Sequence, residues 1–428
     1  MDRPLAHYII SSSHNTYLTG GQLNSASTVE IYRQVLLAGC RCLEIDIWNG
    51  DDGEPIVTHG MTLCTQILFK DVMRAIAEYA FVNSPWPVIL SFENHCNKEQ
   101  MRKMATYCKE AFGQLLQSEF LPGDGYDKLP RDLPSPRQLM YRIIIKNKKC
   151  KTSGSDEDAG HGDPDSSQDF SAQDDSITSD NRDGDLGMHQ EIDGEIETEN
   201  EEELQRRKER TKEIAKELSD LVNYCTPYPF QDFVDYNKLQ LSRIYPAGSR
   251  ISSTNFNPQL FWNVGCQLVA LNWQTMDRPM QINLGRFVEN GRSGYCLKPP
   301  ILCDPSKSFD PFEVSVIEGV VPVQMTIQVF SLQGIPRRDC QPIVNIQLIG
   351  LPEDTKAHVF NTRPSRGRGL NPRWNSDNTF IVPRITLPEM SCLRFAVIDN
   401  KDQTLLGWAV LPVNSMRSGF RYIPLEVS

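Results

Sequence analysis

The first 150 residues alternate short apolar runs with longer stretches in which apolar residues recur every three or four positions. The short runs are typical of buried strands, and the longer stretches predict amphipathic helices. This alternation predicts a mostly parallel sheet, open or closed into a barrel, with functional residues at the carboxyl ends of its strands. The predicted strands are 7–12, 42–48, 55–59, 87–93 and 142–147, and the predicted helices are 27–38, 67–80 and 98–117.

The next segment, residues 151–203, has no periodicity and holds 19 Asp and Glu against two Lys and Arg. Such a segment cannot bury enough apolar surface to offset the entropy lost on ordering, so we predict that it is disordered. A helical pattern returns over 204–221, and the α/β style resumes over 211–305 with strands predicted in 242–248 and 266–272.

Beyond residue 312 the pattern becomes purely β. Alternating runs over 324–329, 343–348 and 393–398 are separated by Gly, Pro and Asn, which predicts an antiparallel sandwich. The fold class is therefore α/β plus all-β: a barrel, interrupted at a surface loop by an acidic linker, followed by a sandwich. We place the first barrel half at 1–150, the linker at 151–210, the second half at 211–305 and the sandwich at 312–428.

Charge and cysteine content refine this picture. The net charge is −11, and the linker alone contributes −17, which leaves about +6 for the rest. A mildly basic body suits anionic lipid or phosphate ligands, although this excess is also ordinary for a surface of that size. No signal peptide and no run of about 18 apolar residues is present, so we expect the twelve cysteines to be reduced.

Polar side chains with catalytic potential occur at the ends of four predicted strands. Glu44 and Asp46 lie two apart on one strand and therefore face the same side. Together with an amide and a third carboxylate they offer four oxygen ligands for a hard cation such as Ca²⁺ or Mg²⁺. The two histidines are then free for proton transfer. The set consists of His14, Asn15, Glu44, Asp46, His59 and Glu93.

Cationic residues complete the predicted site. Lys146 and Lys148 offer two ammonium groups for phosphates, Arg243 offers a bidentate fork, and Tyr245 offers a ring face. Each feature alone is more often ordinary surface, but their combination indicates cleavage of a phosphodiester that carries further phosphates. We interpret the neighbouring His95 as a loop residue and not as a metal ligand.

Several motifs closely resemble the phosphoinositide-specific phospholipases C. The resemblance assigns 1–150 to the X half of a TIM-type barrel, about 215–305 to the Y half and 312–428 to a C2 domain. Two further stretches, 32–41 and 233–238, resemble the β-type enzymes. The motifs are 11–18, 39–46, 57–59, 89–95, 143–149 and 241–248.

The resemblance implies a role for each candidate residue. His14 would stabilise the pentacoordinate phosphoryl group, and His59 would protonate the diacylglycerol oxygen. Glu44 or Asp46 would help to deprotonate the inositol 2-hydroxyl. The Ca²⁺ ligands would be Asn15, Glu44, Asp46 and Glu93, and the ring would be held by Lys146, Lys148, Arg243 and Tyr245.

The implied reaction is Ca²⁺-dependent hydrolysis of phosphatidylinositol 4,5-bisphosphate to diacylglycerol and inositol 1,4,5-trisphosphate. The implied location is cytoplasmic, peripheral to the inner face of the plasma membrane, with anionic membranes and heterotrimeric G protein subunits as candidate partners. Leu23 and Leu63 match an apolar rim that dips into the bilayer. The acidic linker would repel anionic lipid, which suggests autoinhibition.

The sequence departs from the family pattern in the Y half. About 35 residues that normally supply a strand, a helix and a phosphate-binding serine are missing between 225–230 and 233–238. A barrel without this unit must leave a gap, re-pair its neighbours or fail to fold stably, because free strand edges are costly. This favours the main alternative, a catalytically impaired isoform or a lipid- or protein-binding scaffold.

Two further points remain open in the sequence. A glycerophosphodiester-type phosphodiesterase would share the His and Glu-x-Asp pattern, but it has no use for the cluster of phosphate-binding cations. The sandwich has few acids near its predicted loop ends, only Asp339, Asp399 and Asp402, so it is a poor candidate for Ca²⁺ binding.

Overall fold

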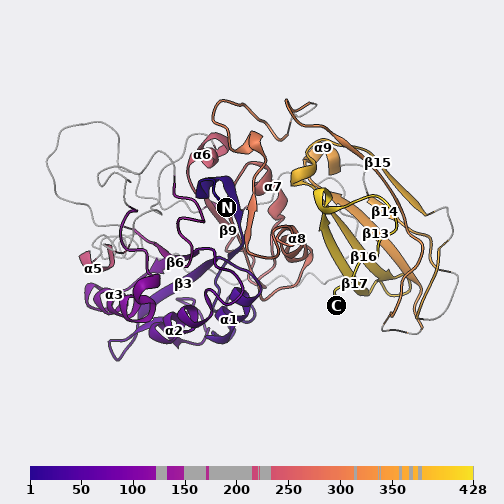
Figure 1. The fold of residues 1–428 in the computed structure, drawn as a ribbon. Coiled ribbons are helices and arrows are strands. Elements are labelled where there is room, and N and C mark those ends of the chain that lie inside the picture. Colours follow the sequence, from indigo (N-terminus) through magenta and orange to yellow (C-terminus); the bar gives the residue numbers. More distant parts are fainter. Residues whose placement is uncertain are drawn as a thin grey trace.

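The protein forms an α/β barrel joined to a β-sandwich (Figure 1). The computed structural model describes residues 1–121, 133–148, 170–172, 215–219, 221, 233–312, 316–335, 337, 339–355, 359–365, 370–374 and 378–427. Most of the predicted elements are confirmed within a few residues. Most of the acidic linker, for which we predicted disorder, lies outside the described residues.

The first barrel half contains four parallel strands that are neighbours in chain order. Three helices pack on them, and their apolar faces join the strands in one continuous core, because apolar residues three and four apart share a face. The strands are β2 (Ser12–Ser13), β3 (Cys42–Asn49), β6 (Val88–Asn94) and β7 (Ile143–Lys146), and the helices are α1 (Glu30–Leu37), α2 (Phe69–Tyr79) and α3 (Lys98–Phe112).

One predicted strand has a different orientation from the expected parallel arrangement. Strand β4 (Pro55–Val57) runs antiparallel to β3 and also pairs with β5 (Ile67–Leu68). Strand β6 occupies one edge of β3, while the short β2 and then β4 share the other edge. His59 therefore follows an antiparallel strand and reaches the site on a loop.

The second barrel half continues the sheet from β2. Strand β10 lies parallel between β2 and β9, with Leu271 opposite Ser13 and Leu268 opposite Arg243. Helices α6, α7 and α8 accompany them, and α5 packs on α3. The bounds are α5 (Lys216–Ser219), α6 (Phe233–Leu239), β9 (Arg243–Pro246), α7 (Pro258–Asn263), β10 (Leu268–Leu271) and α8 (Arg278–Arg286).

The acidic linker supplies one strand, which differs from its predicted disorder. Strand β8 (Phe170–Ala172) pairs in parallel with β9, and Phe170 lies opposite Ile244. The edge of β9 opposite β10 is therefore paired with linker backbone. Among the described residues β7 and β8 do not pair.

Short elements complete the barrel. Strand β1 (Tyr8–Ile10) pairs antiparallel with β11 (Tyr295–Leu297), so the predicted strand over 7–12 is divided between β1 and β2. The 3-10 helices are η1 (Leu5–His7), η2 (Gly113–Leu115), η3 (Pro300–Leu302), η4 (Pro388–Met390) and η5 (Val413–Ser415).

The sandwich has two antiparallel sheets, in the orders β12-β15 and β14-β13-β16-β17. Its acids near the loop ends are paired with bases: Arg337 contacts Asp399 and Asp402, and Lys401 contacts Asp339. The elements are β12 (Val323–Gln328), β13 (Pro342–Ile349), α9 (Pro352–Thr355), β14 (Val359–Asn361), β15 (Thr379–Ile385), β16 (Cys392–Asp399) and β17 (Leu405–Pro412).

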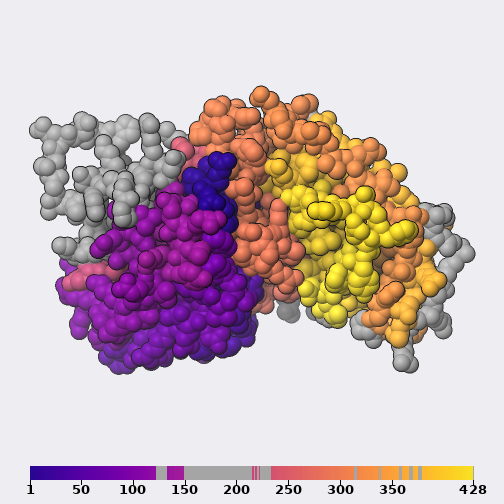
Figure 2. Space-filling model, in the orientation of Figure 1, coloured from indigo at the N-terminus to yellow at the C-terminus, as the bar shows by residue number. Residues whose placement is uncertain are grey.

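The sandwich docks on the second barrel half, and the two adjoin in the space-filling view (Figure 2). Helix α8 lies on β17 so closely that a Cβ at Gly285 would come within 2.2 Å of the Val410 Cβ. The buried Arg286 guanidinium donates to the carbonyl of Glu389 at 2.7 Å. The close approach at Gly285 and the Arg286 hydrogen bond therefore join the sandwich to the second barrel half.

Two composition-based expectations can be compared with the structure. All ten cysteines among the described residues are free thiols, as predicted. Within the same residues, no helix combines the length and the apolar character that a bilayer crossing requires.

Candidate active site

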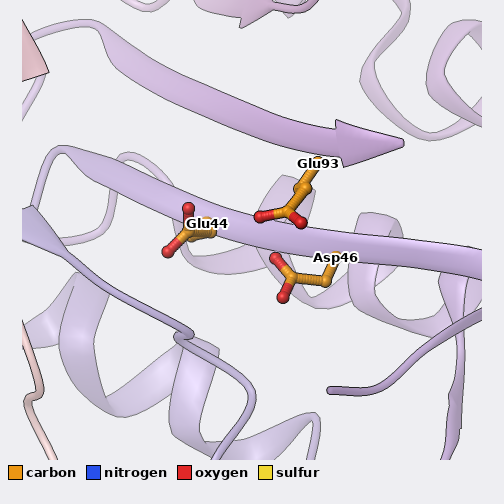
Figure 3. A group of neighbouring side chains, drawn as sticks. All are labelled: Glu44, Asp46 and Glu93. Atoms are coloured by element: carbon orange, nitrogen blue, oxygen red, sulfur yellow. The ribbon is translucent and has the colours of Figure 1, made fainter. Parts of the chain in front are cut away.

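Three carboxylates converge from the middle of β3 and the carboxyl end of β6 (Figure 3). Glu44 and Asp46 lie two residues apart on β3 and face the same side of the sheet, as predicted. The parallel register places Asp46 opposite Glu93 on β6. Ligand oxygens of all three lie within 4.8 Å of one another. Such a spacing allows one cation to contact all three groups.

Asp46 is the most constrained of these acids. Burial raises its pKa well above the ordinary value, and the nearby Glu93 and Glu44 carboxylates add to the increase. The Tyr17 hydroxyl donates to its Oδ2 at 2.5 Å. Its Oδ1 is buried and has no hydrogen-bond partner among the described residues. A buried oxygen without a donor, among like charges, fits a divalent cation as its natural partner.

Asn15 adds an amide to this group. Its φ of 41° lies in the left-handed region, which Asn tolerates better than most residues. Its backbone N–H donates to Glu44 Oε2 at 2.8 Å, and its Nδ2 donates to Gln22 Oε1 at 2.8 Å. The side-chain oxygen is therefore the atom that Asn15 can offer to a cation.

Arg243 ties the second barrel half to the carboxylates. Its Nη2 lies 2.9 Å from Glu44 Oε2, and both side chains are buried. Burial opposes ionisation of Glu44, but Arg243, His14 and the Asn15 N–H outweigh it, so the pKa of Glu44 is lowered overall. Glu44 thus carries its charge at neutral pH, as a metal ligand or base requires.

His14 is held by two contacts. Its Nδ1 must donate to Asn272 Oδ1, 2.9 Å away, because that oxygen can only accept. Its ring stacks on Tyr245, with centroids 5.7 Å apart and planes 6° apart. Burial lowers the pKa of His14, and Glu44 and Asn272 partly offset this. The imidazole is thus fixed in orientation, with Nε2 as its remaining polar atom.

His59 is fixed in a similar way. Its Nδ1 lies 2.6 Å from the backbone carbonyl of Gln22, which can only accept. The following Gly60 packs on Trp48 so tightly that a Cβ would lie 1.9 Å from the indole ring. Both candidate histidines therefore use Nδ1 for the protein and keep Nε2 for other contacts.

His95 has a larger structural role than the sequence suggested. It directly follows β6, and its Nε2 lies 2.9 Å from Glu93 Oε1. Its ring stacks on that of Trp48, with the ring centroids 4.0 Å apart. It therefore supports a candidate metal ligand from outside the carboxylate group.

The candidate phosphate-binding residues come from both barrel halves. Lys146 is the last residue of β7 in the first half, and Arg243 is the first residue of β9 in the second half. Tyr245 lies beside Arg243, whose Cζ is 5.4 Å from the ring centroid. Lys148 is exposed beyond the end of β7, so strand alternation does not place it with Lys146.

Two residues of the site were missed from the sequence. Asn272 directly follows β10, and the rule that flagged His14 and Glu93, polar residues at strand ends, could have found it. Gln22 lies in a turn with no recognisable pattern, and its contacts arise only from the fold.

Comparison with known families identifies the barrel. Residues 1–149 match the model of the phosphatidylinositol-specific phospholipase C X domain, and residues 196–301 match the Y domain of the same family. The chain belongs to the phosphatidylinositol-specific phospholipase C family. Residues 323–423 match the C2 domain model, in agreement with the sandwich.

Several relatives of this chain are of the beta type. The chain is 40% identical to human 1-phosphatidylinositol 4,5-bisphosphate phosphodiesterase beta-4 and 41% identical to the bovine beta-1 protein, each over 100% of this chain. It spans 42% and 38% of their lengths. The bovine alignment extends over 471 residues against 428 in this chain, so the relative contains residues without a counterpart here.

The fold is also shared with solved structures. The L. pealei PLC21 crystal structure matches 100% of this chain and 54% of its own, with a TM-score of 0.82 and 39% identity. S. officinalis PLC21 matches with the same TM-score and identity over 99% of this chain and 53% of its own. The barrel and C2 architecture is thus shared with these structures.

Proposed function

We propose that this protein hydrolyses phosphatidylinositol 4,5-bisphosphate to diacylglycerol and inositol 1,4,5-trisphosphate in a Ca²⁺-dependent reaction. The observation that carries the proposal is the convergence of three carboxylates from β3 and β6 beside two oriented histidines and a buried arginine. The named relatives, which are 1-phosphatidylinositol 4,5-bisphosphate phosphodiesterases, support this choice of substrate. We propose the domain limits 1–150, 151–210, 211–305 and 312–428 for this enzyme.

Asn15, Glu44, Asp46 and Glu93 would hold the Ca²⁺, and the partnerless Oδ1 of Asp46 supports this assignment. When bound, a divalent cation supplies charge stabilisation at the phosphoryl group and lowers the pKa of a coordinated hydroxyl. Glu44, which is held ionised by Arg243, can accept the proton of the attacking inositol hydroxyl.

The two histidines would act through Nε2. Because Nδ1 of His14 donates to Asn272, Nε2 faces the substrate and can donate to the phosphoryl oxygens once it gains a proton. Burial opposes that cationic form of His14 by lowering its pKa, and the neighbouring Glu44 carboxylate favours it. Because Nδ1 of His59 donates to Gln22, its Nε2 can carry the proton that the diacylglycerol oxygen needs on leaving.

The ring phosphates would be held by Lys146, Lys148 and Arg243, with Tyr245 packing against the ring. Arg243 would then contact substrate and Glu44 together, which couples substrate binding to the carboxylate group. A substrate without ring phosphates would leave these cations unused, which favours a phosphoinositide over a simple glycerophosphodiester.

The site is flanked by exposed apolar side chains that suit membrane contact. Leu23, Met61, Leu63 and Ile251 are 46%, 76%, 87% and 51% exposed. Their loops are joined, since Leu63 N–H donates to the Leu23 carbonyl and Gln22 N–H donates to the Ile251 carbonyl. We propose that this rim inserts into anionic membrane at the inner face of the plasma membrane, and that G protein subunits act as partners there.

The direct test is Ca²⁺-dependent release of inositol trisphosphate from mixed micelles. We expect release by the wild-type chain, and a loss of about 10²–10⁴-fold in His14→Ala because a positioned acid–base group contributes that much. Release must also stop on addition of a chelator. A folded wild-type chain that releases no product would instead support the scaffold alternative.

The acidic linker provides a second test. Removing residues 176–200 deletes eight acids and one Arg but keeps β8. We expect hydrolysis of anionic vesicles to rise by about 10-fold, because less negative charge opposes encounter with the membrane. An uncharged Gly/Ser segment of equal length should have the same effect, and salt should shrink the difference. An unchanged rate in both variants would contradict autoinhibition by charge.

A further inference from the structure

Gln22 lies at the centre of the hydrogen bonds that orient the candidate active site. It is 6% exposed and lies in the turn after Asn15. Its Oε1 accepts from Asn15 Nδ2 at 2.8 Å. An Asn amide can rotate by half a turn at small cost, and this bond selects the orientation that leaves the oxygen of Asn15 for a cation.

The other end of the same side chain reaches the His14 support. Gln22 Nε2 donates to Asn272 Oδ1 at 3.2 Å and to Ser253 Oγ at 2.8 Å. Asn272 Oδ1 is the atom that accepts from His14 Nδ1. Two donors on one oxygen fix the Asn272 amide, so the position of His14 depends on Gln22.

The backbone of Gln22 serves the second histidine. Its carbonyl accepts from His59 Nδ1 at 2.6 Å, and its N–H donates to the Ile251 carbonyl at 2.8 Å. Asn15, His14 and His59 thus share one neighbour, and the side-chain and backbone contacts of Gln22 can be separated by substitution.

We propose that Gln22 is a positioning residue that sets the Asn15 oxygen for Ca²⁺ and, through Asn272, the His14 imidazole for the phosphoryl group. The inference rests on the proposed function of the site. An amide is required because the contacts need an acceptor toward Asn15 and donors toward Asn272 and Ser253. Glutamate would keep the acceptor and lose the donors, and methionine would fill the space and lose both.

The test compares Gln22→Met and Gln22→Glu with wild type, each in the whole 428-residue chain. Gln259→Met is the matched control, since Gln259 is 2% exposed and donates to Asn263 and Met390, at the contact with the sandwich. Two properties are measured: the Ca²⁺-induced shift in melting temperature without substrate, and kcat as a function of Ca²⁺ concentration.

We expect Gln22→Met to need about 10-fold more Ca²⁺ for both the melting shift and half-maximal activity, as for loss of an outer-shell partner. Its kcat should also fall by about 10-fold or more, because His14 is displaced. Gln22→Glu should lose kcat similarly while its Ca²⁺ requirement changes less. Gln259→Met should lower the stability of the protein and leave both its Ca²⁺ requirement and its kcat unchanged.

The inference and the proposed function can fail separately. If wild type responds to Ca²⁺ and Gln22→Met matches Gln259→Met in Ca²⁺ requirement and kcat, the positioning role of Gln22 is overturned. If wild type shows neither a Ca²⁺-induced melting shift nor turnover, the proposed function is overturned and the role of Gln22 with it.

Discussion

Replacing Asp46 with Asn is expected to stabilise the Ca²⁺-free protein by roughly 1–3 kcal/mol while abolishing its response to Ca²⁺. Asp46 is buried beside Glu44 and Glu93, and its Oδ1 has no hydrogen-bond partner among the described residues. The Asn oxygen can still accept from Tyr17, so the change removes charge with little loss of contact. Chemical denaturation in chelator, and again in Ca²⁺, measures both effects.

The pH dependence should have a defined sign. The pKa of Asp46 is raised in the folded state, first by burial and then by Glu93. Its contribution to stability is therefore present below the ordinary carboxyl pKa of about 3.9 and is lost as the pH rises toward the raised value. In chelator, the advantage of Asp46→Asn should grow with pH. An advantage independent of pH would contradict charge repulsion as its cause.

The exposed Asp71 provides the control for this experiment. Its side chain is 44% exposed and pairs with Arg74 one turn along α2. Asp71→Asn should change the free energy of unfolding by no more than about 0.5 kcal/mol, with no effect on the Ca²⁺ response.

Replacing Arg243 with Met is expected to destabilise the protein by about 3–5 kcal/mol and to abolish activity. The substitution leaves the buried Glu44 carboxylate without the cation 2.9 Å away. A buried charge without its partner loses attraction while still bearing its desolvation cost. Denaturation at fixed pH measures the loss, and the micelle assay measures activity.

A second substitution tests the cause. Adding Glu44→Gln to Arg243→Met removes the isolated charge, so it should recover at least half of the lost stability but none of the activity. Arg102→Met, at an exposed ion pair with Glu217, should cost less than about 1 kcal/mol. A double variant as unstable as the sum of the single variants would show that the two groups act independently.

The placement of the candidate site residues could be predicted where it depends on residues close together in the sequence. Glu44 and Asp46 face one side because strand side chains alternate, and β3 confirms the predicted strand. The helices were predictable because their apolar faces repeat within a few residues. The resemblance to the family grouped His14, His59 and the carboxylates into one site. The role that it implies for each residue stays a prediction.

The orientation of β4 and the pairing of β8 were not predictable in this way. A three-residue apolar run such as Pro55–Val57 has the same pattern in a parallel and an antiparallel sheet. The acidic linker has the composition of a disordered segment, yet three of its residues pair with β9, whose edge would otherwise be free.

The sequence by itself determined the alternation of elements, the acids on one strand face and the family of this chain, because these follow from local periodicity and motifs. Only the tertiary structure decided that Asp46 lies opposite Glu93, that Arg243 pairs with Glu44, and that Gln22 joins Asn15 to the His14 support. Such partners are distant in sequence and are selected by strand register and burial, which depend on the whole fold and leave no local pattern.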